Sequence, residues 1–168
     1  MKDLRLALAF LTRIPVAPSG SAAIPTPILG VWFPVAGLVI GVLVGAGYWL
    51  CFQVVPPISA AILAVSVGAI VTGAFHEDGL ADTFDALGGG QDRESALRIF
   101  KDSRLGTFGA TALILSIFLR VALLGSLSAG AGFLALVAAH SIGRGLSAAT
   151  MGFTHPATTG LGKSLMAG

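Results

Sequence analysis

Seven of the chain's eight acidic residues lie in one short segment. They are Glu77, Asp78, Asp82, Asp85, Asp92, Glu94 and Asp102. The stretch before them, from Ile14 to His76, contains no acidic residue, no lysine and no arginine. Because ionised side chains are costly to place in an apolar environment, we expect this segment to be both a polar loop outside a membrane and a site that binds cations.

Three of these carboxylates have a spacing that suits metal binding. Asp78, Asp82 and Asp85 follow an i, i+4, i+7 pattern, so on a helix they lie on one face. Like charges on one face repel and weaken the helix unless a cation neutralises them. Carboxylate oxygens suit Mg²⁺ or Mn²⁺, and Mg²⁺ commonly combines one or two protein carboxylates with substrate phosphates. We therefore predict a magnesium site that faces a phosphorylated substrate.

Other polar residues close to these three are candidates for different roles. Glu77 points away from Asp78 on an ideal helix, so it is a weaker candidate metal ligand. His76 is a candidate base or substrate ligand, with a hydrogen-bonding spacer as the alternative. Asp92 and Glu94 are typical of a helix start, as the N-cap and a first-turn acid.

The segment KDSRLGTFG, which begins at Lys101, brings basic, acidic and hydroxyl groups together before a glycine turn. Lys101, Arg104 and Arg98 are candidates for holding phosphate oxygens. Asp102 is a candidate functional acid, and Ser103 can bond either the backbone or a ligand. A phosphate clamp beside the acidic residues would complement a metal site.

The composition indicates a membrane protein. The chain is 55% hydrophobic and 11% charged, with a mean hydropathy of +0.90, whereas soluble domains carry roughly 25% charged residues. The fold class we predict is all-α: a polytopic transmembrane helical bundle with an acidic cytoplasmic helix-loop-helix insertion. The formal charge of +2 lacks an aromatic-rich basic face, so nucleic acid is not an expected partner. The single cysteine, Cys51, excludes an intrachain disulfide.

Spanning a bilayer takes about 20 apolar residues, and four windows within one domain (1–168) qualify. They are 27–52, 57–75, 107–127 and 131–151. Lysine and arginine precede the first window, follow the fourth at Lys163, and occur between the second and third, but are absent from the other two connectors. By the positive-inside rule, the N-terminus and the loop 76–106 are expected on the cytoplasmic side.

Two arginines and the N-terminal segment add further expectations. Arg120 lies near the middle of the third window, so it must pair, reach the interface or face a cavity. Arg144 either extends to the interface or contacts a phosphorylated substrate. Leu4, Leu8 and Leu11 share one helical face, which is typical of a helix that lies on the membrane surface.

The motifs also resemble a known family. HEDGLADTFDALGGG at 76–90, followed by KDSRLGTFG at 101–109, is similar to the signature of cobalamin synthase, also called adenosylcobinamide-GDP ribazoletransferase. AFLTRIPV near the start and FPVAGLVIG at 33–41 agree with it, and AHSIGRGLS agrees more weakly. Family members are usually considerably longer, so we expect this chain to lack C-terminal spans.

The resemblance implies a reaction and a set of roles. The enzyme joins adenosylcobinamide-GDP to α-ribazole or its phosphate, releases GMP, depends on Mg²⁺ and resides in the bacterial inner membrane. Carried over, Asp78 and Asp82 would hold Mg²⁺ against the pyrophosphate, with Glu77 as a helper and Asp85 as a further ligand or the base. Basic side chains would clamp phosphate, with Asp102 orienting them; these are Lys101 and Arg104. A homo-oligomer is compatible with this interpretation.

Two other functions compete with the enzyme hypothesis. A cation or proton transporter would use the acidic cluster as an ion vestibule, but it predicts ionisable groups deep in the spans, where only Arg120 lies. A membrane scaffold with an acidic docking loop predicts that total charge matters and the order of the aspartates does not.

Overall fold

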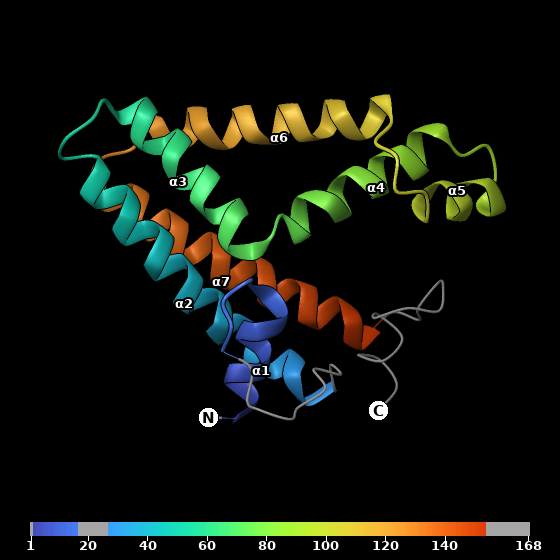
Figure 1. Cartoon of the computed structure of the whole chain (residues 1–168), viewed down its shortest axis with the longest axis horizontal. Coiled ribbons are helices and arrows are strands. Elements are labelled where there is room, and N and C mark those ends of the chain that lie inside the picture. The colour runs from blue at the N-terminus through green and yellow to red at the C-terminus, as the bar shows by residue number, and fades with distance from the viewer. Residues whose placement is uncertain (1, 17–26, 154–168) are drawn as a thin grey trace.

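The computed structural model describes residues 2–16 and 27–153, and that part of the chain is built from α-helices joined by short connectors (Figure 1). The expected all-helical class is confirmed, while Lys163 lies outside the described residues. The helices in chain order are α1 (Lys2–Leu11), α2 (Pro27–Cys51), α3 (Pro57–Thr72), α4 (Phe75–Gly89), α5 (Arg93–Phe100), α6 (Thr107–Gly125) and α7 (Ala129–Phe153).

Helices α2 and α7 form the most closely packed pair, and glycines on α2 allow the approach. A Cβ at Gly37 would meet the backbone of His140 and the side chain of Arg144, and one at Gly41 would meet Val137. Small residues at such contacts let membrane helices pack closely. This close packing holds the Arg144 stem against α2.

A buried tyrosine joins α2 to the end of α6. Tyr48 is fully buried, and its hydroxyl donates to the Leu124 carbonyl (2.9 Å) and to the Leu127 carbonyl (3.3 Å). A Cβ on Gly132 of α7 would collide with the Tyr48 ring. One side chain therefore fixes three helices at the closed end of the wedge from which α6 and α7 diverge (Figure 1).

Within the described residues, three helices are long and apolar enough to cross a membrane: Gly30–Cys51, Thr107–Gly125 and Ala129–Met151. The second expected window, 57–75, is broken. Helix α3 ends at Thr72, and α4 leaves it at an angle of 89°, so this pair qualifies only when taken together. The bend is made at Gly73 (φ 66°) and Ala74 (φ 56°), both in the left-handed region, and the Gly73 N–H caps the last carbonyls of α3.

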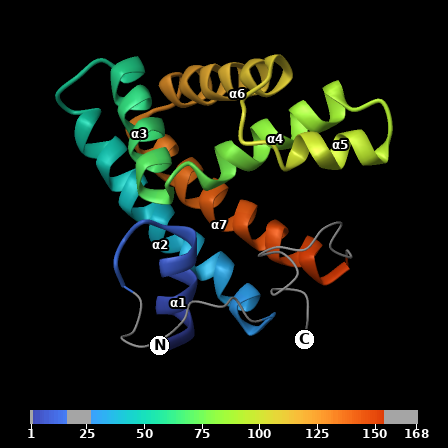
Figure 2. The same ribbon diagram turned by 45° about the vertical axis from the view of Figure 1, so that its right-hand side comes forward.

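The acidic segment forms two helices, as predicted. Helix α4 continues through Gly88 and ends at Gly89. Helix α5 begins with the predicted Asp92 cap, whose side chain accepts from the Ser95 N–H (2.8 Å), and ends at Phe100. Helices α4 and α5 lie side by side, away from the α2–α7 pair (Figure 2).

Helix α1 packs its leucine face on the start of α2, whereas the sequence predicted that this face would lie on the membrane surface. Leu11 is buried, and Leu4 and Leu8 are partly buried against the core. The Phe10 ring stacks on Phe33 with ring centroids 5.8 Å apart, and it meets Phe75, the first residue of α4, edge-on. The N-terminal helix thereby supports the α3–α4 bend.

Candidate active site

The three predicted metal ligands lie on one face of α4 but in three different environments. Asp78 is exposed, Asp82 is half-buried and Asp85 is buried at the contact with α6. Partial burial raises the pKa of Asp82, and the charges of Asp78 and Asp85 raise it further. The like-charge repulsion expected from the spacing is therefore present along this face.

Asp85 stabilises the start of α6. Its carboxylate accepts from the Gly106 N–H (2.7 Å) and from the Gly109 N–H (2.8 Å), so both oxygens are used. These N–H groups belong to the first turn of a helix, which lacks internal acceptors. A Cβ at Gly106 or Gly109 would press on this carboxylate. Asp85 thus has a structural role that its spacing did not reveal.

A magnesium site on this face would be built mainly from Asp78 and Asp82. Among the described residues, no group of three histidine, cysteine or acidic side chains is gathered closely enough to hold a metal ion alone. Two hard carboxylates nevertheless fit Mg²⁺, which typically completes its shell with water and substrate phosphates. The residues present are therefore compatible with a metal that arrives together with a phosphorylated substrate.

The connector between α5 and α6 brings the predicted basic residues to the far end of α4. Arg104 donates to both Asp102 oxygens, with a closest approach of 2.6 Å, and this bonding lowers the pKa of Asp102. Lys101 and Ser103 are exposed on the same connector. Since Gly106 binds Asp85, one turn of helix separates this connector from Asp82.

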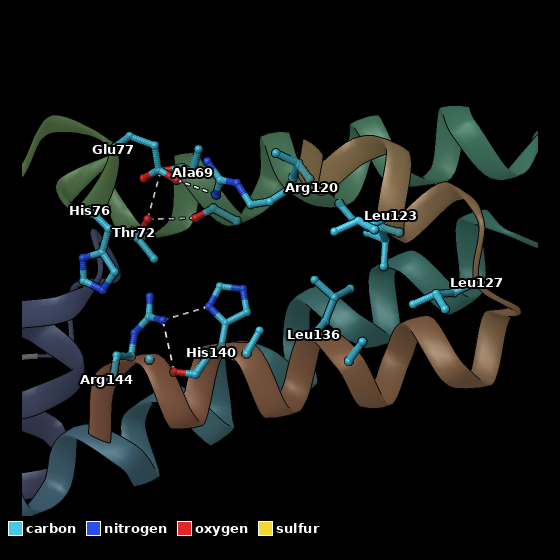
Figure 3. A pocket seen from close by; sticks show the side chains of 17 residues that line it. Ala69, Thr72, His76, Glu77, Arg120, Leu123, Leu127, Leu136, His140 and Arg144 are labelled. Atoms are coloured by element: carbon cyan, nitrogen blue, oxygen red, sulfur yellow. Dashed lines mark hydrogen bonds and ion pairs between the residues drawn. The ribbon is translucent and has the colours of Figure 1, made fainter. Parts of the chain in front are cut away.

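A cavity of about 400 Å³ opens at the other end of α4. It lies between α3, α6 and α7, with the first turn of α4 at its rim (Figure 3). Polar side chains gather at one end, and leucines line the other (Figure 3). The polar side chains are Thr72, His76, Glu77, Arg120, His140 and Arg144.

Two arginines meet this polar end in different ways. Arg120 donates to Glu77 (2.8 Å), and this ion pair compensates the charge that Arg120 introduces into an apolar helix. Arg144 is only 4% exposed, and it contacts the Nδ1 atom and the carbonyl of His140 (2.9 and 3.2 Å). One of the two alternatives for Arg144 was that its side chain extends to the membrane interface. In the structure the side chain is buried and faces the cavity instead.

The cavity brings together residues from the predicted acidic loop and from a predicted membrane span. His76 and Glu77 from the acidic segment lie at the same cavity as Arg144, which is distant in the chain. His140 and Thr72 were not predicted as site residues. The spacing of His140 and Arg144, one helical turn apart in AHSIGRGLS, was the available signal for the histidine.

The match to a family model covers nearly the whole chain. Residues 3–168 match the model described as cobalamin-5-phosphate synthase. The chain belongs to this family. The resemblance drawn from the motifs of α4 and of the α5–α6 connector is thereby confirmed.

Curated relatives of this family carry one name. The chain is 44% identical over 158 residues to the adenosylcobinamide-GDP ribazoletransferase of Bradyrhizobium diazoefficiens, covering 92% of this chain and 61% of the relative. It is 45% identical over 150 residues to that of Rhizobium etli, covering 85% and 58%, and 46% identical over 123 residues to that of Shewanella baltica, covering 70% and 46%. The chain thus spans about three-fifths or less of the length of these relatives. No solved structure matches it.

Proposed function

We propose that this protein is a Mg²⁺-dependent transferase of the inner membrane that joins adenosylcobinamide-GDP to α-ribazole or its phosphate. The observation that carries the proposal is α4. A single helix presents Asp78 and Asp82 on one face, with the polar cavity at one end and the basic connector at the other. Family membership and the name shared by the relatives support the same activity.

The reaction is a phosphoryl-type transfer. A ribose hydroxyl of ribazole attacks the pyrophosphate phosphorus that carries cobinamide. A new P–O bond forms to the ribose oxygen, the bond to the bridging oxygen breaks, and GMP leaves; the hydroxyl proton passes to a base. Such a transfer depends on positioning and on neutralising phosphate charge more than on covalent catalysis.

Each part of the site has a task in this scheme. Asp78 and Asp82 would hold Mg²⁺, which neutralises the pyrophosphate charge when bound. Lys101 and Arg104 contact phosphate oxygens, with Arg104 oriented by Asp102 and Ser103 available beside them. We leave Asp85 out of the proposed metal set, because each of its oxygens already accepts a backbone N–H group.

The proposed orientation places the N-terminus, α4 and α5 on the cytoplasmic side, where nucleotide substrates are available. Its support is the distribution of lysine and arginine, which occur at α1 and in the α5 region and are absent from the 53–56 and 126–128 connectors. Lipid surrounds the exposed apolar residues of α6 in this arrangement.

The test is GMP release by the purified chain in detergent. Adenosylcobinamide-GDP and α-ribazole are supplied with Mg²⁺ or with EDTA. We expect GMP only with Mg²⁺, and a loss of more than about a hundredfold in Asp82→Asn, since one metal ligand is removed. Asp92→Asn is the matched control, because asparagine is also a good N-cap and Asp92 lies outside the site. Metal-independent release, or equal activity of both variants, contradicts the proposal.

A further inference from the structure

Two buried polar atoms at the cavity have no hydrogen-bond partner within the described part of the chain. They are the Nε atom of Arg144, a donor, and the Oε2 atom of Glu77, an acceptor. Both belong to residues that line the cavity, and Arg144 as a whole is only 4% exposed. Because an unsatisfied buried polar group is costly, the cavity calls for an occupant with one acceptor and one donor.

A hydroxyl-bearing molecule meets this need. A hydroxyl donates to the free Glu77 oxygen, and a hydroxyl or ester oxygen accepts from the Arg144 Nε. A simple anion satisfies only the arginine and is repelled by the glutamate. A simple cation satisfies only the glutamate and is repelled by the arginine. The polar end of the cavity therefore favours a sugar-like group over an inorganic ion.

The opposite end of the cavity is apolar. Leu123, Leu127 and Leu136 line it (Figure 3). Burying apolar ligand surface there contributes roughly 25 cal/mol per Å². An occupant that satisfies both ends has an apolar body and a hydroxylated end.

The size of the cavity selects between the two substrates of the proposed reaction. A volume of about 400 Å³ is at the small end of the range for sites that bind drug-sized ligands, roughly 300–1,000 Å³. A corrinoid macrocycle with its amide side chains is far bulkier than such a space. A ribonucleoside with an apolar bicyclic base has the right size and the right division between apolar and polar ends.

We propose that this cavity binds the acceptor nucleoside, with its apolar base against the leucines and its ribose hydroxyls at Glu77 and Arg144. The inference rests on the proposed function and assigns one substrate to one place. Since Asp78 follows Glu77 in α4, the ribose end lies at the start of the helix that carries the metal-binding face. The bulkier corrinoid diphosphate approaches from outside, along α4 and the basic connector.

The first test blocks the apolar space and measures binding alone. Equilibrium dialysis of the full 168-residue chain in detergent uses radiolabelled 5,6-dimethylbenzimidazole riboside, without corrinoid and without Mg²⁺. Gly143 lines the cavity, and a Cβ there meets nothing within 4 Å, so Gly143→Leu places its side chain in open space. We expect the affinity to fall at least about tenfold, because the leucine side chain takes space that the ligand would fill; a tenfold loss corresponds to about 1.4 kcal/mol.

A matched control separates cavity filling from a general effect of leucine in a helix. Gly47 of α2 is also helical and exposed, a Cβ there also meets nothing within 4 Å, and it is not among the cavity residues. Gly47→Leu should bind the riboside with unchanged affinity. Equal binding by wild type and Gly143→Leu overturns the inference, and so does an equal loss in both variants.

The second test addresses the polar end. The free base, which lacks the ribose hydroxyls, should bind wild type several-fold more weakly than the riboside and should be insensitive to Glu77→Gln. Riboside binding should weaken in Glu77→Gln. If the base and the riboside bind alike, the ribose hydroxyls are not recognised and the inference fails. The inference also fails if a long-chain phospholipid displaces the riboside competitively while Gly143→Leu and Glu77→Gln leave the affinity for the riboside unchanged, because the cavity is then a lipid site.

The two proposals fail in different ways. Saturable riboside binding that Gly143→Leu abolishes, combined with no GMP release under any condition, rejects the proposed transfer and keeps the cavity assignment. Mg²⁺-dependent GMP release with a Michaelis constant for the riboside that Gly143→Leu leaves unchanged rejects the cavity assignment and keeps the transfer.

Discussion

At the scale of single residues, identical side chains at regular spacing have taken different roles. Asp78, Asp82 and Asp85 are indistinguishable in the i, i+4, i+7 pattern, yet only Asp85 is buried and bound by backbone N–H groups. The difference comes from α6, whose first turn lies against the last of the three. A pattern on one helix contains no information about which neighbour will cover it.

The first prediction separates the structural from the functional carboxylate. Asp85→Asn replaces one acceptor with an NH₂ group facing an N–H donor, so we expect a loss of about 1–3 kcal/mol and a melting temperature in detergent lower by several degrees. Asp82→Asn should not lower the melting temperature, since it removes one of three like charges that repel one another along the same face of α4. A thermal-shift assay on both variants measures this, and the reverse order of effects would contradict it.

The second prediction concerns the ion pair between Glu77 and Arg120. Removing one partner leaves the other charge unpaired in a largely apolar setting, whereas removing both leaves no unpaired charge. Arg120→Met and Glu77→Gln should therefore each lower the melting temperature more than the double variant does. A double-mutant cycle read by thermal shift measures the coupling. Additive effects would show that the pair contributes nothing as a pair.

At the scale of helices, most elements could be predicted and one bend could not. Hydropathy predicted α2, α6 and α7 within a few residues of their bounds, and it extended the second window to residue 75 because Ala74 and Phe75 are apolar. The helix ends earlier because Gly73 caps α3 in a left-handed conformation. Periodicity and composition do not report such a local change of backbone conformation.

The cavity illustrates a second limit at this scale. The acidic face of α4 and the pair formed by His140 and Arg144 each depend on local spacing, so each was within reach of sequence reasoning. The start of α4 lies close to His140 and Arg144 only because of the bend after α3 and the close packing of α2 against α7 at Gly37. Long-range packing of this kind has no signature in one sequence.

The third prediction tests the bend. Gly73→Ala places a Cβ at φ 66° and against Arg13, so it should destabilise the protein by at least about 1 kcal/mol. The same substitution at Gly79, where a Cβ meets nothing within 4 Å, should stabilise α4 by roughly 0.5–1 kcal/mol. Melting temperatures of the two alanine variants should therefore move in opposite directions. A shared direction would mean that the bend does not depend on the glycine.

The fourth prediction concerns the cap of α5 and its pH dependence. Hydrogen bonds from the Ser95 backbone and hydroxyl lower the pKa of Asp92 below its ordinary value. A lowered folded-state pKa stabilises the helix above the unfolded pKa, and this contribution is lost as pH falls through the folded one. Hydrogen exchange across Arg93–Phe100, corrected for intrinsic rates, should show protection that decreases only in acid. In Asp92→Asn that decrease should vanish, and an unchanged acid dependence would assign it to another group.

At the scale of the whole molecule, the helices form a wedge, and the two proposed binding sites lie in different parts of it. Helices α2 and α7 form the closely packed arm, α3 and α6 join it at the Tyr48 end, and α4 and α5 extend from the bend (Figures 1 and 2). The proposed acceptor cavity lies inside the wedge, and the proposed metal face lies on the arm that leaves it. The wedge has this function only if α4 and α5 lie on one defined side of the bilayer.

The last prediction tests that orientation with single cysteines. In a Cys51→Ser background, Val54→Cys tests the α2–α3 connector, where Val54 is 81% exposed, and Ser128→Cys tests the α6–α7 connector. Ser103→Cys tests the connector between α5 and α6. In right-side-out inner-membrane vesicles, a membrane-impermeant maleimide should label the first two variants and reach the third only after permeabilisation. Inverted vesicles should give the opposite pattern, because the basic residues around Ser103 favour the cytoplasmic side. Labelling of Val54→Cys and Ser103→Cys from the same side would mean that the chain does not cross the bilayer between these two positions, and the proposed cytoplasmic site would have to be abandoned.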